Sequence, residues 1–183
     1  MRAAILFVAA IALAAPAAAQ LAEANVDYAG FETLTRDVAG YRQQRLLDWD
    51  AFSRKAKEPG VLLLDARSAD AFAAGHIQGA VNLPFTDFTP ESLVAVIGDK
   101  NRPVLIYCNN NFVNDRAPVM MKLRPLALNI QTFINLVGYG YPNVYELKSA
   151  IDFNDPKIGW VKGEAALRRE AARERLLARP SGG

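Results

Sequence analysis

The sequence predicts an α/β domain in which a central, mainly parallel sheet has helices on both faces. Short, largely apolar segments at 61–64, 80–83 and 104–107 have the character of strands buried in a parallel sheet. Segments with helical spacing of apolar residues, bounded by Gly and Pro, alternate with them. About half of the residues are apolar, which is enough for a packed core between the layers.

The first residues have the pattern of a secretory signal peptide. Arg2 precedes an uncharged apolar run, 5–15, and the small residues 17–19 follow Pro16. The run is shorter than the roughly 20 residues that a membrane span needs, although an uncleaved anchor is the alternative. We predict a signal peptide at 1–19, export to the periplasm, and no stable membrane insertion after cleavage.

The remaining length fits one domain with short extensions. We divide it into an N-terminal extension at 20–45, the domain at 46–160 and a charged C-terminal tail at 161–183, either helical or disordered. A docking helix for a partner is the alternative for the tail. The net charge of +2 provides no global attraction to nucleic acid, so no nucleic-acid partner is expected.

Helix signals before the cysteine are local and specific. Apolar residues at helical spacing predict a helix around 28–38. Asp48 is a candidate N-cap for a helix that ends by Lys57, and Gly75 is expected to end a short helix at 70–74. Thr89, followed by Pro, has the pattern of an N-cap before a helix that ends near 97.

The chain after residue 108 is less regular. A polar loop at 109–115 is expected to lead into a short helix that carries Pro118 in its first turn and ends by Pro125. A helix at 132–136 and a Gly-rich turn then precede a final strand at 144–147.

Cys108 is the only cysteine, so no intrachain disulfide can form. It follows the apolar strand 104–107, and the N–H groups of the loop and of the next helix would point at its sulfur. Such donors stabilise a thiolate, which is the nucleophilic form of cysteine. If Cys108 works as a thiolate, its pKa lies well below the free value of about 8.5.

Three patches make the chain resemble the rhodanese-like domain. These are LLLDARSADAFAAGHIQGAVNLP at 62–84, VLIYC at 104–108 and GYGYPNVYEL at 138–147. The resemblance covers about 46–160 and implies a rhodanese-like three-layer sandwich with Cys108 as the catalytic, sulfur-carrying residue. It also implies that Asp65, Arg67 and His76 are structural residues near the site.

The loop after the cysteine departs from this family. Family sulfurtransferases commonly have a six-residue loop with a basic residue, whereas this loop is longer and its first basic residue is Arg116. The His-Cys, five residues and Arg pattern of the related phosphatases is absent, which disfavours a phosphatase or arsenate-reductase activity. Between Cys108 and Gly140 the chain is about a dozen residues longer than compact members, an insertion of a size that often marks a functional loop.

The loop residues are the candidate substrate-binding group, because asparagine amides can act as uncharged donors to an anion. This group comprises Asn109, Asn110, Asn111, Phe112, Val113, Asn114 and Arg116. The alternative is a loop of turn-forming residues whose side chains bond the chain's own backbone. No cluster of metal-ligating residues is present, so we predict no metal site and no cofactor.

The residues and the resemblance together favour a sulfurtransferase or persulfide carrier. Cys108 would take sulfane sulfur from a small sulfur-containing anion such as thiosulfate and pass it to an acceptor, which could be a protein. The alternative is a non-catalytic module that binds a partner or a small oxyanion, or that senses oxidants through Cys108.

Overall fold

The computed structural model describes residues 25–163 and 167–168. The expected signal peptide at 1–19 lies outside the described residues, as does most of the expected tail at 161–183. Within the described part of the chain, no helix has both the length and the apolar character that crossing a bilayer would require.

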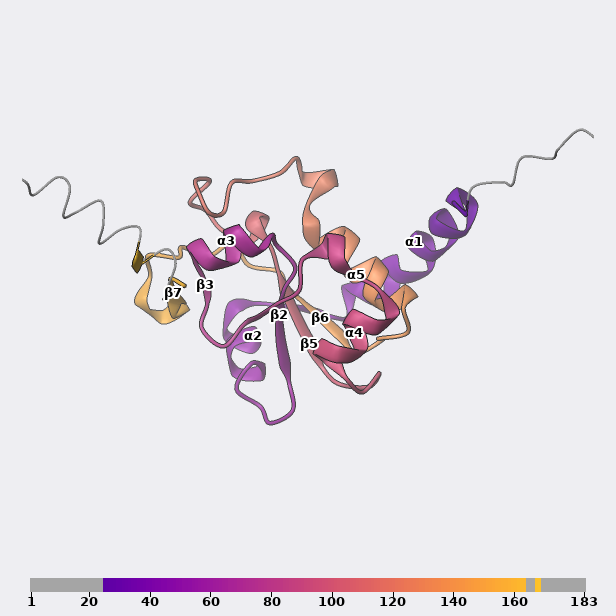
Figure 1. Cartoon of the computed structure of the whole chain (residues 1–183), viewed down its shortest axis with the longest axis horizontal. Coiled ribbons are helices and arrows are strands. Elements are labelled where there is room, and N and C mark those ends of the chain that lie inside the picture. Colours follow the sequence, from indigo (N-terminus) through magenta and orange to yellow (C-terminus); the bar gives the residue numbers. More distant parts are fainter. Residues whose placement is uncertain (1–24, 164–166, 169–183) are drawn as a thin grey trace, which may run out of the picture.

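The domain is built on a five-stranded parallel sheet in the order β1-β6-β5-β2-β4 (Figure 1). Its strands are β1 (Leu46–Leu47), β2 (Leu62–Asp65), β4 (Val81–Asn82), β5 (Val104–Tyr107) and β6 (Val144–Leu147). The α/β prediction with a central parallel sheet is confirmed. The strand at 144–147 is not the edge of this sheet, because β6 lies between β1 and β5.

Alternating side chains of the strands contribute to two separate cores, one on each face of the sheet. In β5, Val104 and Ile106 point to one core, whereas Leu105 and Tyr107 point to the other. All four strand residues are buried, as expected for a parallel strand covered on both faces.

Three helices cover the first face: α1 (Tyr28–Gln43), α4 (Pro90–Ile97) and α5 (Leu128–Gly138). The second face is covered by α2 (Trp49–Lys55) and by a small antiparallel pair of β3 (His76–Ile77) with β7 (Trp160–Val161). Helix α3 (Ala69–Ala74) follows β2. Figure 1 shows α1, α4 and α5 gathered on one side of the sheet and α2 on the other.

The local helix signals are confirmed. Asp48 accepts a hydrogen bond from the N–H of Ala51 at the start of α2, and Gly75 ends α3. Thr89 forms a reciprocal capping box with Ser92 at the start of α4, whose first residue is Pro90.

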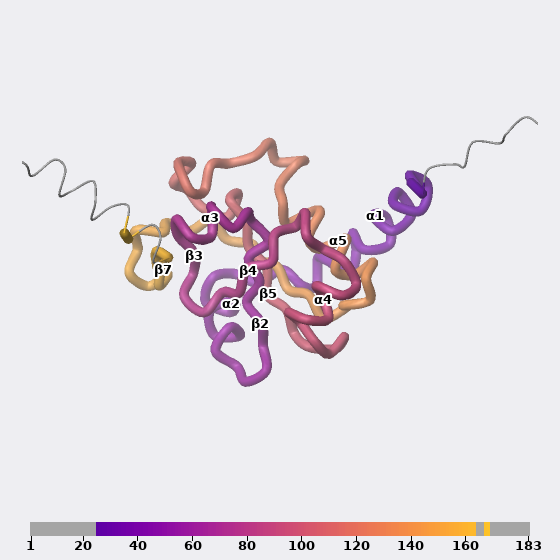
Figure 2. The backbone as a smooth tube through the Cα atoms, viewed as in Figure 1, coloured from indigo at the N-terminus to yellow at the C-terminus, as the bar shows by residue number. Residues whose placement is uncertain are grey.

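The helix predicted around Pro118 is wrong. Figure 2 shows residues 113–127, here called the arch, running past one end of the sheet before the chain enters α5. The arch contains only the 3-10 turn η3 (Arg124–Leu126), because side chains of earlier residues take the backbone hydrogen bonds that a helix would need. Three further 3-10 turns are η1 (Phe85–Asp87), η2 (Asn109–Asn111) and η4 (Pro156–Ile158).

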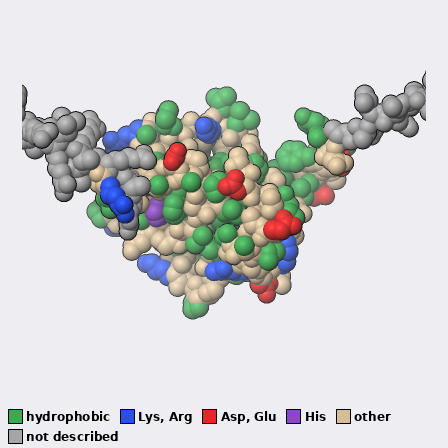
Figure 3. Space-filling model, in the orientation of Figure 1, with side chains coloured by type: hydrophobic (Ala, Val, Ile, Leu, Met, Phe, Trp, Pro, Cys, Tyr) green, Lys and Arg blue, Asp and Glu red, His purple; other side chains and the backbone are tan. Residues whose placement is uncertain are grey.

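Helix α5 is longer than the predicted 132–136, because it begins at Leu128 and ends at Gly138. The β3–β7 pair was not predicted, because a strand of two residues is too short to show an alternating pattern of apolar and polar residues. On the face shown in Figure 3, positive and negative side chains are scattered among apolar ones.

Removing the Thr89 cap tests the start of α4. We expect Thr89→Ala to lower the free energy of unfolding by about 1 kcal/mol, because the hydroxyl that accepts a hydrogen bond from the Ser92 N–H is lost. The matched control is Thr33→Ala, which removes an exposed mid-helix hydroxyl bonded only to Ala29 O. Urea denaturation followed by circular dichroism measures both, and equal losses would contradict the capping role.

Candidate functional site

Cys108 lies where β5 ends, at the carboxyl edge of the sheet, and its side chain is buried with only 1% exposed. Turn η2 begins immediately after it. Because parallel strands end at the same edge, the ends of β2 and β6 lie beside it.

Backbone N–H groups from two segments converge on the Cys108 sulfur. Asn110 and Asn111 supply donors from η2, and Leu128 and Asn129 supply donors from the start of α5. The helix whose N-terminus faces the sulfur is therefore α5, some twenty residues downstream, and not a helix directly after the loop as the sequence predicted. These are the donors that an anionic sulfur would need.

Burial nevertheless raises the pKa of the Cys108 thiol above its ordinary value. The hydrogen bonds from Asn129, Asn110 and Leu128 act to lower this pKa, while the nearby charge of Glu146 raises it further. The lowered pKa that the thiolate hypothesis requires is thus not found in the arrangement described here. In it, the thiol is shielded and neutral at pH 7.

The side chain of Asn111 holds this edge of the sheet together. Its Oδ1 accepts hydrogen bonds from the Cys108 N–H at 2.9 Å and from Asn129 Nδ2 at 2.9 Å. Its Nδ2 donates to Leu147 O at 2.7 Å and to Ser149 O at 3.3 Å. One buried amide therefore joins the ends of β5 and β6 to the first turn of α5.

The network continues to an ion pair between the buried Glu146 and the half-buried Arg42. Asn129 Nδ2 also donates to Glu146 Oε1 at 3.2 Å, and Arg42 of α1 binds the Glu146 carboxylate with two hydrogen bonds of 2.5 and 2.6 Å. Sequence reasoning missed Asn129, Glu146 and Arg42. A charged residue within the apolar strand VYEL was the available signal for Glu146.

Asn109 and Asn110 bind the arch instead of facing an open pocket. Asn109 Nδ2 donates to Met120 O at 2.9 Å, and Asn110 exchanges two hydrogen bonds with the backbone of Lys122. Asn114 lies further along and bonds the Asp152 carboxylate and the Phe153 N–H. In this arrangement the amide donors of these asparagines serve the chain's own groups, which is the alternative considered from the sequence.

The other loop residues lie apart from the sulfur. The Phe112 ring is 1% exposed and packs in the core of the second face, 5.1 Å from the Trp160 ring. Val113 is exposed. Arg116 lies beside Phe153 and Asn154 and lines a cavity of about 440 Å³ with Trp160.

Asp65 and Arg67 form a buried ion pair with an N–O distance of 2.6 Å, in keeping with a structural role. Arg67 also donates to Gly75 O, and the Tyr107 hydroxyl donates to Asp65 at 2.6 Å. Burial acts to lower the pKa of Arg67, but the hydrogen bonds and the charge of Asp65, together with Tyr107, outweigh it, so the pKa is raised. Burial and then the Asp65 charge raise the pKa of Tyr107.

His76 lies on β3. Its ring stacks on Phe72 with 3.7 Å between centroids, and its Nδ1 is 2.8 Å from Phe72 O. Among residues 25–163 and 167–168, no three His, Cys, Asp or Glu side chains come together in a way that could bind a metal ion.

Fold and site together define an α/β protein with one cysteine held at the carboxyl edge of a parallel sheet. The family model described as the rhodanese-like domain matches residues 48–152, which is more than half of the chain. This chain belongs to the rhodanese-like domain family. No curated protein matches it.

Solved structures share the fold at low identity. The Alr3790 protein from Anabaena sp. is 18% identical with a TM-score of 0.48, and the match covers 71% of this chain and 91% of that one. A thiosulfate sulfurtransferase from Pseudomonas aeruginosa is 19% identical with a TM-score of 0.45, over 64% and 20% of the two chains. A variant of EanB in complex with hercynine is 18% identical with a TM-score of 0.50, over 75% and 33%.

Asn111→Ala tests the buried amide. We expect the free energy of unfolding to fall by about 2–4 kcal/mol, because four hydrogen bonds are lost and buried partners are left unsatisfied. Asn110→Ala, on the same turn but bonded to the exposed arch, is the control and is expected to cost about 1 kcal/mol or less. Chemical denaturation measures both. Similar losses would show that Asn111 has no special role.

The raised pKa of Cys108 predicts how stability depends on pH. As the pH rises, the unfolded chain loses this thiol proton near the free pKa of about 8.5, whereas the folded chain loses it only at a higher pH. The stability that the buried thiol contributes is therefore present below that pH and is lost as the pH rises. We expect the free energy of unfolding of the native chain to fall more steeply than that of Cys108→Ala between about pH 8 and 9.5.

Urea denaturation at a series of pH values measures the free energy of unfolding of both chains. The pH values stay below about 10, where tyrosine side chains titrate. Equal slopes for the two chains would contradict the raised pKa. A native chain that gains stability toward pH 8.5, relative to the variant, would instead indicate a thiolate.

Proposed function

We propose that this protein is an exported sulfur carrier of the rhodanese-like family that holds sulfane sulfur as a persulfide on Cys108. The observation that carries the proposal is the convergence of four backbone N–H groups on this sulfur. Donors aimed at one atom stabilise negative charge there.

The chemistry has two steps. When the site is open to solvent, the Cys108 thiol loses its proton to water. The resulting thiolate attacks the sulfane sulfur of thiosulfate, the S–S bond breaks, and sulfite leaves with the bonding electron pair. A thiolate acceptor, on a small molecule or on a protein, then attacks the outer sulfur of the persulfide and restores the Cys108 thiolate. No metal or cofactor takes part in either step.

Loading is proposed to require residues 120–126 of the arch to move, because the sulfur is almost completely buried. Three solvent-exposed hydrogen bonds from Asn109 and Asn110 tie residues 120–122 of the arch to η2, whereas Val119 before them is buried in the core. Bonds of this kind open at low free-energy cost compared with the core. Arg116, beyond the loop, is proposed to attract the anionic donor.

A binding or redox-sensing module is the second candidate. It is favoured by the raised pKa of the Cys108 thiol and by the lack of a basic residue between Cys108 and Arg116. In such a module the cysteine reacts only when an oxidant or partner opens the arch. Export is proposed for either function, on the signal-peptide pattern of residues 1–19.

Intact mass spectrometry after incubation with thiosulfate tests the proposal. We expect the native chain to gain one sulfur atom, the gain to disappear on adding cyanide, and Cys108→Ser to gain none. Asn110→Ala is expected to load faster, because two of the three hydrogen bonds that tie residues 120–122 to η2 are removed.

Failure to gain sulfur would overturn the carrier proposal, provided that the same sample alkylates fully at Cys108 after denaturation. Gain of oxygen on exposure to peroxide, without gain of sulfur from thiosulfate, would favour the sensing module instead.

A further inference from the structure

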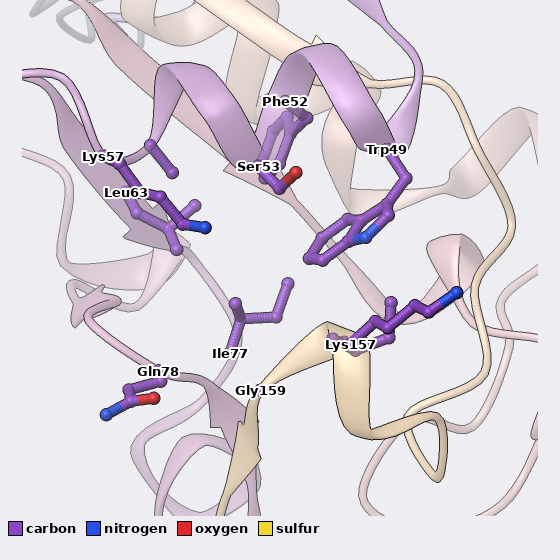
Figure 4. A pocket seen from close by; sticks show the side chains of 11 residues that line it. Trp49, Phe52, Ser53, Lys57, Leu63, Ile77, Gln78, Lys157 and Gly159 are labelled. Atoms are coloured by element: carbon purple, nitrogen blue, oxygen red, sulfur yellow. The ribbon is translucent and has the colours of Figure 1, made fainter.

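A cavity of about 270 Å³ lies on the second face of the sheet, between α2 and the β3–η4–β7 region. Figure 4 shows it lined by Trp49 and Phe52 on one side and by Ile77 and Lys157 on the other. Cys108 follows Tyr107, whose side chain points to this second face, and its sulfur bonds to the start of α5 on the first face. The cavity is therefore separated from the cysteine by the sheet.

The floor of the cavity is apolar and rigid. Four of its residues belong to the core of the second face and are almost fully buried: Phe52, Leu63, Ile77 and Ile158. The half-buried Trp49 indole stacks on Phe52, with 6.2 Å between ring centroids, and offers a flat aromatic wall. Such a site suits a flat apolar group, and its volume is near the lower end for small-molecule sites, roughly 300 Å³.

The rim is positively charged. Lys57 and Lys157 line opposite sides of the cavity (Figure 4), and neither forms an ion pair within the described residues. The neighbouring acids have other partners, since Glu58 binds Lys55 and Asp155 accepts the Lys157 N–H at the start of η4. Two cations without carboxylate partners above an apolar floor complement an anion with an apolar body.

We propose that this cavity is a binding site for a small aromatic carboxylate, with the ring between Trp49 and Ile77 and the carboxylate at Lys57, while Lys157 on the opposite side adds positive charge to the rim. The Ser53 hydroxyl and the Gln78 amide, also on the lining, add polar groups at the mouth. Binding here does not require the cysteine, so the site is independent of sulfur transfer.

The probe is 2-naphthoate, titrated into the full chain and followed by tryptophan fluorescence and by calorimetry. We expect saturable binding that weakens at high salt, with 2-naphthylmethanol, the uncharged analogue, binding at least tenfold more weakly. The double variant Lys57→Met and Lys157→Met is expected to lose at least tenfold in affinity for 2-naphthoate.

Two controls make the result specific. Lys148→Met removes an exposed lysine outside the cavity and is expected to bind like the native chain, as is Cys108→Ala. Ile77→Trp fills the cavity and should abolish binding.

Three outcomes would overturn the proposal. These are no saturable binding by the folded native chain, equal binding of the uncharged analogue, or unchanged affinity in the double-lysine variant. Because both lysines are exposed, their replacement is not expected to disturb folding, which circular dichroism checks.

Discussion

Satisfying buried polar groups at the carboxyl edge of the sheet is the constraint on which the rest of this structure depends. Three strands end there with polar residues that water does not reach, and each needs a partner in the protein. Asn111 meets this need with one amide that bonds the start of η2, the end of β6 and the first turn of α5. The position of α5 against Cys108 follows from that arrangement.

The same constraint explains the character of the cysteine. Its sulfur is surrounded by N–H donors suited to an anion, yet it is so deeply buried that its pKa rises. Donors and burial thus act in opposite directions on one atom. A site of this kind stays unreactive while the arch is closed and offers ready stabilisation to charge once solvent or a substrate enters. Such a site is compatible with a carrier and with a sensor, so the fold alone does not distinguish the two functions.

Much of the fold could be predicted from the sequence because its signals are local. The strand at 104–107 has a continuous apolar run, and Asp48 and Thr89 cap their helices within three residues. The arch could not be predicted. Pro118 and Pro125 suggest a helix between them, but Asn109, Asn110 and Asp115 take up the backbone groups of 120–122. Those competing bonds depend on where the loop lies in space, which no window of sequence records.

The candidate site could likewise be predicted only where its signals are local in the sequence. Cys108 and the Asp65–Arg67 pair were identified, since strand ends and the family motif mark them. Glu146 and its partner Arg42 are 104 residues apart in the chain, so their pairing could not be inferred. The orientation of the asparagine amides also depends on distant backbone groups. An amide can bind an anion or the chain's own backbone, so the residue type alone does not decide between these roles.

Helix α1 has a consequence for where this domain can be cut. The family match begins at residue 48, but Arg42 neutralises Glu146 beneath the cysteine, and Val38 belongs to the core of the first face. A fragment trimmed to the family boundary would lose α1 and the edge strand β1, and it would leave the buried Glu146 carboxylate without its cation. We therefore expect the smallest stable fragment of this protein to begin upstream of residue 48 and to include α1, which the family match leaves out.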